Sequence, residues 1–270
     1  MLVIGTSVLL IFLSPLAKTA GQFFKATRKG NAPNFWVLSG SLIISWVFAK
    51  SIANDSDLGF RFGKTGGLAY ASYYASFIVA GIIIYRMRVK GGVQSIHTFL
   101  GAKFGRTALQ LFSVVIAIRL FNEVWSNTMV IGYYFGEYGS VGFYSSVLLF
   151  TGLTLVYSLK GGLSSSIFSD IIQMILFGVL LVAILLIFNN KGTDKITAVM
   201  HHGEFSIGGG VYLLIVGLLH SFSYPFHDPV MTDRGFISAP KTTLWSFITA
   251  GIIGGALIFL FSLVGVFGKL

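Results

Sequence analysis

The sequence contains no cysteine and few charged residues. Its 270 residues include 19 basic and 9 acidic side chains, so charged residues make up only 10% of the chain. The absence of cysteine excludes disulfides, thiolate metal sites and cysteine nucleophiles. The sequence also lacks an HExxH pair, a GxxxxGK phosphate loop and a GxSxG elbow. No nucleophile–base or metal constellation can be assembled, so the residues predict neither an enzyme nor a cofactor.

Apolar residues are abundant, at 54% of the chain. They come in blocks of about 17–25 residues, the length that crosses a bilayer as a helix. These blocks predict an all-α, polytopic membrane helix bundle in one domain, 1–270. The first block has no basic n-region and no cleavage site, so it is interpreted as an N-terminal anchor helix, 1–20, and not as a signal peptide. The candidate spans are 1–17, 35–55, 66–85, 107–135, 141–158, 164–188, 209–225 and 243–267.

Lysine and arginine concentrate in alternate connections between these spans, above all in 18–29 and 86–106. Connections rich in basic residues stay on the cytoplasmic side. The pattern predicts a multi-pass protein of the cell membrane with its N-terminus outside. The excess positive charge then lies against an anionic leaflet, so it does not indicate nucleic acid.

Two places carry charge inside apolar spans. Lys50 is the single formal charge among residues 35–54. Either it is a buried functional lysine, which needs a partner or a cavity, or its long stem reaches the outer interface. Arg119 and Glu123 lie four residues apart near the middle of the fourth span, so they can pair on one helix face. They form a structural ion pair or a polar wall of a solute pathway, and Glu123 is also a candidate partner for Lys50.

A longer pattern joins the fifth and sixth predicted spans. Tyr157-Ser158-x-x-Gly161-Gly162-Leu163-x-Ser165 is followed by Asp170-x-x-Gln173. This pattern resembles the signature of the sodium:solute symporter family. The stretches "FFKATRKGNAPNFWVLSGSLIISW", "RMRVKGGVQSIHTFLGAKFG" and "DRGFISAPK" also resemble segments of that family.

The resemblance implies an inverted-repeat (5+5) transporter fold. Residues 35–188 match the first five-helix repeat and residues 209–267 match the start of the second, so the fold is truncated after the second helix of repeat two. In this fold the first helix of each repeat is interrupted, and its backbone carbonyls and helix ends face the ion and the solute. The interruption of the first core helix falls at about 44–48.

The resemblance also assigns residues to roles. Carbonyls of Ile44 and Val47 are the sodium ligands that the first repeat contributes, and the remaining ligands belong to a helix outside the matched region. Trp46 stands beside that site, where family members often carry a small or polar residue. Lys50 follows about one turn later, where it can replace a cation, bind an anionic solute or pair with Glu123. Sodium is therefore the candidate coupling ion, with no other metal and no other cofactor expected.

The sixth core helix matches "LHSFSYPFHDP". His220, Ser221 and Tyr224 are expected to face the solute, although Tyr224 is equally an interfacial ring and His220 a hydrogen-bonded core histidine. Asp170 and Arg234 match positions that face each other on the inner side. They are interpreted as an ion pair of the inner gate, with structural clamping as the alternative.

The resemblance implies a secondary active transporter, cation (sodium)-coupled, that moves a small solute by symport. The alternative is a transport-inactive membrane sensor or interaction domain that retains the symporter fold. The expected partners are a small-molecule solute and the lipid bilayer. The residues predict neither the solute, nor the stoichiometry, nor the oligomeric state.

Overall fold

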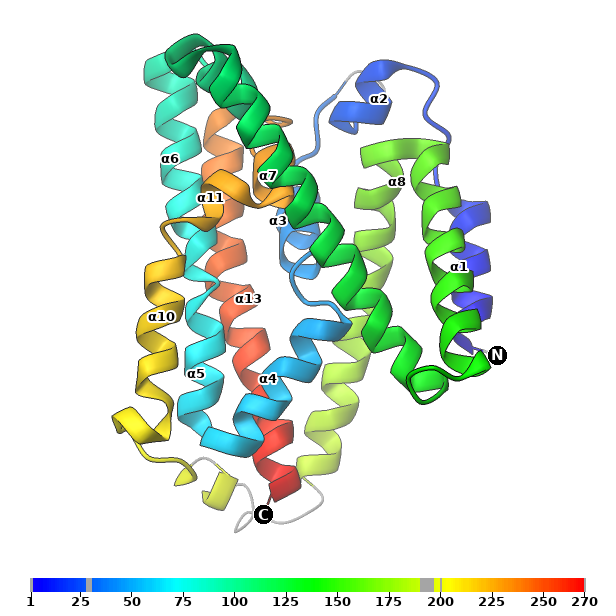
Figure 1. Ribbon diagram of the computed structural model, residues 1–270, viewed down its shortest axis with the longest axis vertical. Coiled ribbons are helices and arrows are strands. Elements are labelled where there is room, and N and C mark those ends of the chain that lie inside the picture. The colour runs from blue at the N-terminus through cyan, green and yellow to red at the C-terminus, as the bar shows by residue number, and fades with distance from the viewer. Residues whose placement is uncertain (1, 28–30, 190–196, 200, 270) are drawn as a thin grey trace.

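The computed structural model describes residues 2–27, 31–189, 197–199 and 201–269, and within them all the elements of regular secondary structure are helices, with no strand. Figure 1 shows a bundle in which α7 crosses the front diagonally and α13 runs through the centre. The elements are α1 (Leu2–Leu13), α2 (Ala20–Lys25), α3 (Phe35–Ile44), α4 (Ala49–Phe62), α5 (Lys64–Ser72), α6 (Ala75–Gly91), α7 (Ile96–Phe135), α8 (Val141–Asn189), the π-helix η1 (Ile207–Val211), α10 (Tyr212–His220), α11 (Tyr224–His227), α12 (Pro229–Arg234) and α13 (Pro240–Lys269).

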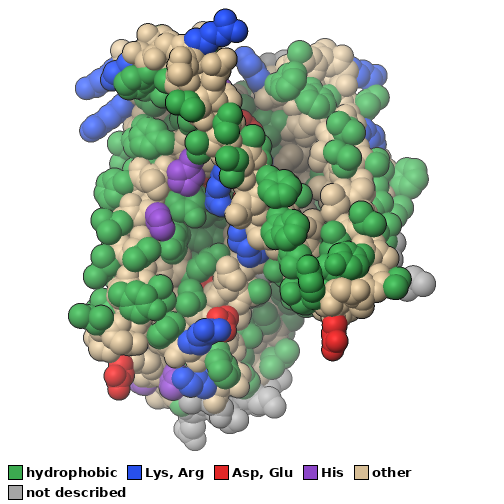
Figure 2. Space-filling model, viewed as in Figure 1, with side chains coloured by type: hydrophobic (Ala, Val, Ile, Leu, Met, Phe, Trp, Pro, Cys, Tyr) green, Lys and Arg blue, Asp and Glu red, His purple; other side chains and the backbone are tan. Residues whose placement is uncertain are grey.

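Four helical segments among the described residues are long and apolar enough to cross a membrane. They are Lys64–Gly91, Ile96–Phe135, Val141–Phe188 and Pro240–Lys269, and two shorter apolar helices are Phe35–Ile44 and Ile207–His220. The expected all-α membrane bundle is therefore confirmed at the level of helix content. Figure 2 shows basic side chains gathered at the end of the molecule where α6 ends and α2 lies, as the charge pattern of the connections predicts. The sidedness of the N-terminus stays a prediction.

The helix that begins at Phe35 ends at Ile44, and the next helix begins at Ala49. Asn34 caps its first turn by accepting a hydrogen bond from the amide of Val37, at 3.0 Å. At the other end the hydroxyl of Ser45 donates to the carbonyl of Ser41 at 2.6 Å, and Phe48 is extended. A hydroxyl that binds the preceding turn competes with the helical backbone pattern. The span expected at 35–55 is thus two helices, α3 and α4, and the interruption lies where the resemblance placed it.

The pattern around Gly162 forms a sharp turn within α8. Gly162 has a φ of 53°, which favours glycine, and the two arms of α8 run antiparallel from it (Figure 1). Lys160 donates to the carbonyls of Ile11 and Phe12, at 2.7 and 3.2 Å. The hydroxyl of Ser165 donates to the carbonyl of Pro15 at 3.1 Å. The lysine and serines of this motif therefore attach α1 and the following loop to the turn of α8.

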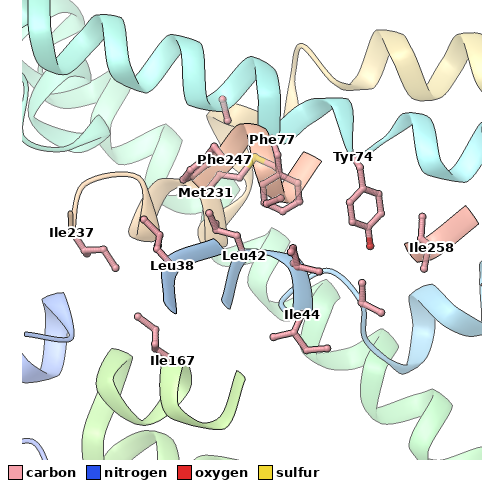
Figure 3. Close-up of a cluster of buried hydrophobic side chains, with 14 of the residues drawn as sticks. Leu38, Leu42, Ile44, Tyr74, Phe77, Ile167, Met231, Ile237, Phe247 and Ile258 are labelled. Atoms are coloured by element: carbon pink, nitrogen blue, oxygen red, sulfur yellow. The ribbon is translucent and has the colours of Figure 1, made fainter. Parts of the chain in front are cut away.

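The hydrophobic core surrounds α13, which packs against α3, α4, α5 and α6. Figure 3 shows Leu38 and Leu42 of α3 lying beside Phe77 of α6 and Phe247 of α13. The rings of Phe77 and Phe247 meet edge to face with centroids 6.0 Å apart. This packing holds α3 in the interior, so the interruption that follows it is enclosed by the bundle.

Replacing Gly59 with alanine is expected to destabilise the bundle. A Cβ atom there would lie 2.0 Å from the carbonyl oxygen of Ser262, which is backbone and cannot turn aside. Overpacking of this kind costs about 1–3 kcal/mol of unfolding free energy. Gly178→Ala in α8 is the matched control, because a Cβ atom there meets nothing within 4 Å. Melting temperatures of the two variants in detergent test the expectation, and equal values would contradict it.

Candidate functional site

A cavity of about 950 Å³ lies beside the interruption between α3 and α4. Its volume is in the range of sites that enclose a small molecule. Trp46 and Lys50 line it from the interrupted helix, Arg119 and Glu123 from α7, and Tyr224 from α11. Five residues that the sequence singled out, from three separate parts of the chain, therefore share one cavity.

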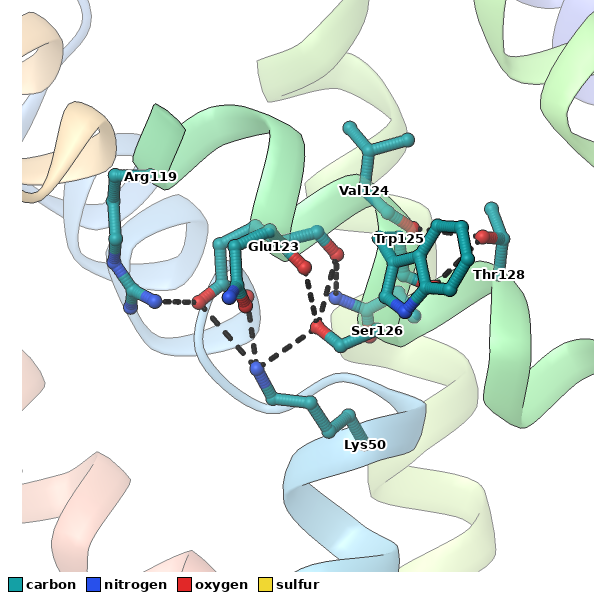
Figure 4. Close-up of polar contacts among 9 residues, drawn as sticks. Lys50, Arg119, Glu123, Val124, Trp125, Ser126 and Thr128 are labelled. Atoms are coloured by element: carbon teal, nitrogen blue, oxygen red, sulfur yellow. Dashed lines mark hydrogen bonds and ion pairs between the residues drawn. The ribbon is translucent and has the colours of Figure 1, made fainter. Parts of the chain in front are cut away.

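Charged groups from two helices meet in the cavity wall, as Figure 4 shows. Glu123 pairs with Arg119 at 2.6 Å and with the ammonium of Lys50 at 3.3 Å. Lys50 also donates to the hydroxyl of Ser126 at 3.0 Å. The three charged side chains are only 21–23% exposed. Lys50 therefore points to α7, where its ammonium contacts Glu123 and Ser126.

Three polar atoms of the cavity wall are buried and have no hydrogen-bond partner within the described residues. They are Nε of Arg119, Oδ1 of Asn127 and Oγ1 of Thr151. A buried polar group without a partner costs free energy, so each is available to a bound molecule or to water. Together they offer an N–H donor, a carbonyl acceptor and a hydroxyl, which suits a polar solute.

Aromatic rings form the wall next to these charges. Trp46 lies edge to face with Tyr224 and Tyr74, at centroid distances of 5.1 and 5.4 Å. The guanidinium of Arg119 lies over the ring of Tyr224 at 5.5 Å, a cation–π distance. The rings of Trp46 and Tyr224 thus connect the interruption after α3 with α11 and α7 around the cavity.

The remaining residues expected at the sodium and solute sites do not line the cavity. Ile44 and Val47 are buried at the interruption itself, and the amide of Val47 donates to the carbonyl of Ile44 at 3.1 Å. Ser221 is buried and donates to the carbonyl of Ser72 on α5, at 3.1 Å. His220 is exposed and stacks on Tyr73, with centroids 5.7 Å apart. His220 and Ser221 are not among the described residues that line the cavity.

A second polar cluster lies in the interior, where α3, α8 and α12 meet. Arg234 pairs with Asp170 at 2.9 Å, and both side chains are at most 10% exposed. The hydroxyl of Ser41 donates to Asp170 at 2.5 Å and lies 2.8 Å from Nε of Arg234. Ser166 accepts a further bond from Arg234 at 3.1 Å. The cluster gives both buried charges hydrogen-bond partners and connects α3, α8 and α12.

Sequence reasoning missed several residues of these clusters. Ser126 lies three positions after Glu123, so helical spacing carried a signal for it. Ser41 lies among small residues that suit close helix packing, and nothing in its neighbourhood in sequence indicated the ion pair. Asp228 lines the cavity and caps α12 by accepting from the amide of Met231 at 3.0 Å. Its place directly before Pro229 is typical of a helix N-cap and was the available signal.

Comparison with known proteins bears on this arrangement. No family model matches the chain. Solute carrier family 5 member 4A of Mus musculus is 23% identical over 248 residues, which are 84% of this chain and 36% of that protein. This relative and the two that follow are sodium:solute symporters. Sodium/glucose cotransporter 1 of Mus musculus is 24% identical over 166 residues, covering 57% of this chain and 23% of that protein. Sodium/glucose cotransporter 2 of Rattus norvegicus is 26% identical over 184 residues, covering 64% and 26%.

The sodium:solute symporter homology confirms the resemblance drawn from the residues. The chain spans about a third of the length of the solute carrier family 5 relatives that it matches over most of its own length. The matched proteins are transporters by name, and two of them are named for sodium and glucose. At the level of the family, homology and apolar helices together support sodium-coupled symport across a membrane.

Proposed function

We propose that this chain forms part of a sodium-coupled symporter that carries a small polar solute through the cavity beside the interrupted helix. The observation that carries the proposal is the position of the Lys50–Glu123–Arg119 cluster, which lines a cavity next to a broken helix. Charged groups in membrane-spanning helices face pathways or partners, because lipid does not tolerate them. Interrupted helices are where transporters of this architecture bind ion and solute.

The cation site follows from the interruption. The carbonyls of Ile44 and Val47 lie where α3 ends, and in this proposal they supply the ligands of the first repeat, residues 35–188. Because Lys50 binds Glu123 and Ser126 at 3.3 and 3.0 Å, its ammonium does not replace the cation at these carbonyls. Residues 209–267 belong to the second repeat, and the protein crosses the cell membrane several times with its N-terminus outside.

The solute is proposed to bind between the aromatic wall and the free polar atoms of Arg119, Asn127 and Thr151. Ring faces of Trp46 and Tyr224 suit a molecule with C–H surfaces, and the polar atoms suit hydroxyl or carbonyl groups. Sugars have both features, and they are the first class to test since two matched relatives are named for glucose. The matched relatives are transporters, so nothing among them favours the alternative of a transport-inactive sensor.

Sodium is expected to change the fluorescence of Trp46, because its ring adjoins the proposed cation ligands. The measurement uses the purified protein with Trp36, Trp125 and Trp245 replaced by phenylalanine, titrated with sodium chloride against choline chloride. A saturable response to sodium alone supports the proposal. An identical response to choline overturns the sodium site.

Replacing Lys50 with alanine tests the role of the cluster in the same assay. Removal of the ammonium leaves Glu123 paired with Arg119 alone, so we expect sodium binding to persist and sodium-dependent uptake of labelled sugars into liposomes to fall at least tenfold, the effect of losing about 1.4 kcal/mol of interaction. Lys64→Ala, at the start of α5, is the control. Loss of the sodium response in Lys50→Ala would instead mean that the ammonium supports the cation site itself.

A further inference from the structure

Asp55, on α4, is a buried carboxylate outside both clusters. Its side chain is 0% exposed, and neither of its oxygens makes a hydrogen bond within the described residues. Its exposed neighbour Asp57, two positions later, pairs with Arg61 at 2.9 Å. The two aspartates of one helix therefore lie in opposite environments, and no cation among the described residues pairs with Asp55.

The surroundings of Asp55 are closely packed. A Cβ atom on Gly59 would lie 2.0 Å from the carbonyl oxygen of Ser262, and one on Gly67 would lie 1.9 Å from the hydroxyl of Ser262. The helices α4 and α5 therefore both touch α13 at Ser262, whose backbone is also the polar neighbour of Asp55. The three helices are therefore in close contact around Ser262.

The titratable groups nearest to Asp55 are phenols. Tyr70 on α5 and Tyr74, which lies between α5 and α6, interact electrostatically with the carboxyl group of Asp55. The hydroxyl of Tyr74 is buried and has no hydrogen-bond partner in the described residues. On α13 the neighbour is Ser262, and the lysine at the end of that helix, Lys269, lies over the ring of Phe60 instead.

Lys50 and Arg61 of α4 and Arg119 of α7 are paired with other carboxylates. Lys50 and Arg119 both pair with Glu123, and Arg61 pairs with Asp57. An ionised carboxylate without a partner in an apolar interior is far less stable than the neutral acid. The environment therefore selects the protonated form of Asp55 for as long as the three helices stay packed.

We propose that Asp55 is a proton-binding site at the junction of α4, α5 and α13, which holds a proton in the packed arrangement and releases it when the helices separate. Its neighbours Ser51, Tyr70 and Tyr74 line the large cavity, while Asp55 is not among the lining residues. Separation of α4 from α13 would admit water to the carboxyl group, which then ionises. The inference goes beyond the proposed function, because it concerns proton binding and stands whether or not sodium drives transport.

The sign of the pH dependence follows from linkage. The packed state binds one proton more than the separated state at neutral pH, so a rise in pH favours separation. For one proton, the ratio of separated to packed protein increases about tenfold for each unit of pH. This holds between the pH at which Asp55 ionises in the separated state and the higher pH at which it ionises in the packed state. Asp55→Asn removes the ionisable group and keeps its shape, so this dependence disappears.

The test compares melting temperatures of the purified protein, Asp55→Asn and the control Asp57→Asn between about pH 6 and about pH 9, where free carboxyl groups are ionised. The native protein and Asp57→Asn should lose stability as the pH rises, while Asp55→Asn should be at least as stable and show a smaller slope. Equal slopes in all three overturn the proposal. The proposal is also overturned if sodium or lithium stabilises the native protein but not Asp55→Asn. The site would then bind a metal ion and not a proton.

A second measurement does not depend on the folding of Asp55→Asn. The infrared band of a protonated carboxyl group should persist in the native protein at about pH 8, where exposed carboxyl groups are ionised. It should shift in Asp55→Glu and stay unchanged in Asp228→Asn. Absence of the band in the native protein, or its loss in Asp228→Asn, overturns the assignment to Asp55.

Discussion

Replacing Glu123 with glutamine is expected to abolish sodium-dependent solute uptake. Glu123 is the carboxylate that contacts both Lys50 and Arg119, at 3.3 and 2.6 Å. Without its charge, the two largely buried cations Lys50 and Arg119 lose the carboxylate that both of them contact. Leaving buried charges without a partner costs about 1–3 kcal/mol or more, and the repulsion adds to that cost. We expect lower stability, an altered cavity and loss of uptake.

The matched control for this variant is Glu137→Gln, because Glu137 is exposed beyond the end of α7. A double-mutant cycle with Lys50→Gln then isolates the pair, since coupled residues give non-additive changes. The double variant should be more stable than the sum of the two single changes predicts. Additive changes, or Glu123→Gln with the stability and uptake of Glu137→Gln, would show that the cluster does not organise the cavity.

Breaking the Asp170–Arg234 pair is expected to have the largest effect on stability. Both side chains are at most 10% exposed, and the pair joins α8 to α12 at 2.9 Å. Removing one partner of a buried ion pair costs roughly 3–5 kcal/mol, because the other charge stays buried without compensation. Asp170→Asn and Arg234→Gln should each show this loss in denaturation experiments. Arg61→Gln is the control, since its pair with Asp57 is more than half exposed.

Ser41 extends this prediction to α3. Its hydroxyl donates to Asp170 at 2.5 Å and accepts from Nε of Arg234 at 2.8 Å, so Ser41→Ala removes both bonds and leaves the Asp170–Arg234 ion pair intact. We expect a smaller loss, about 1–3 kcal/mol, the usual cost of a lost hydrogen bond to a buried charged group. A loss in Ser41→Ala as large as that in Asp170→Asn would mean that the serine, and not the arginine, is the main partner.

A gate and a clamp predict different accessibility of the cavity. The sequence lacks cysteine, so Thr128→Cys places a thiol in the cavity wall and no other cysteine of the chain reacts with the reagent. If the pair is part of an inner gate, Asp170→Asn should increase the rate at which a polar thiol reagent, added from the inner side of oriented vesicles, reacts with that cysteine. If the pair only clamps the helices, stability should fall while the rate in the folded protein stays unchanged.

The sequence by itself determined the features that depend on neighbours in the chain. Blocks of apolar residues predicted helices of membrane length, and the described residues are helical. The pattern that contains Gly161 and Gly162 joined two predicted spans, and Gly162 forms the turn between the two arms of α8. The four-residue spacing of Arg119 and Glu123 predicted that they can pair, and they do so at 2.6 Å. Helix length, turn geometry and spacing along one helix are local properties, so residues close in sequence suffice to predict them.

Only the tertiary structure decided which helices bring their polar groups together. Lys50 has Glu123 as its partner across 73 positions of sequence, and Ser41 joins Arg234 across 193. Helices that are apolar on every side carry no stripe to show which face is buried. For that reason no pattern in the sequence predicted that Ser221 bonds to α5, or that Asp55 is buried while Asp57 is exposed. Those outcomes depend on how α4, α5 and α13 pack at their small residues, and close packing of that kind is fixed only when the helices assemble.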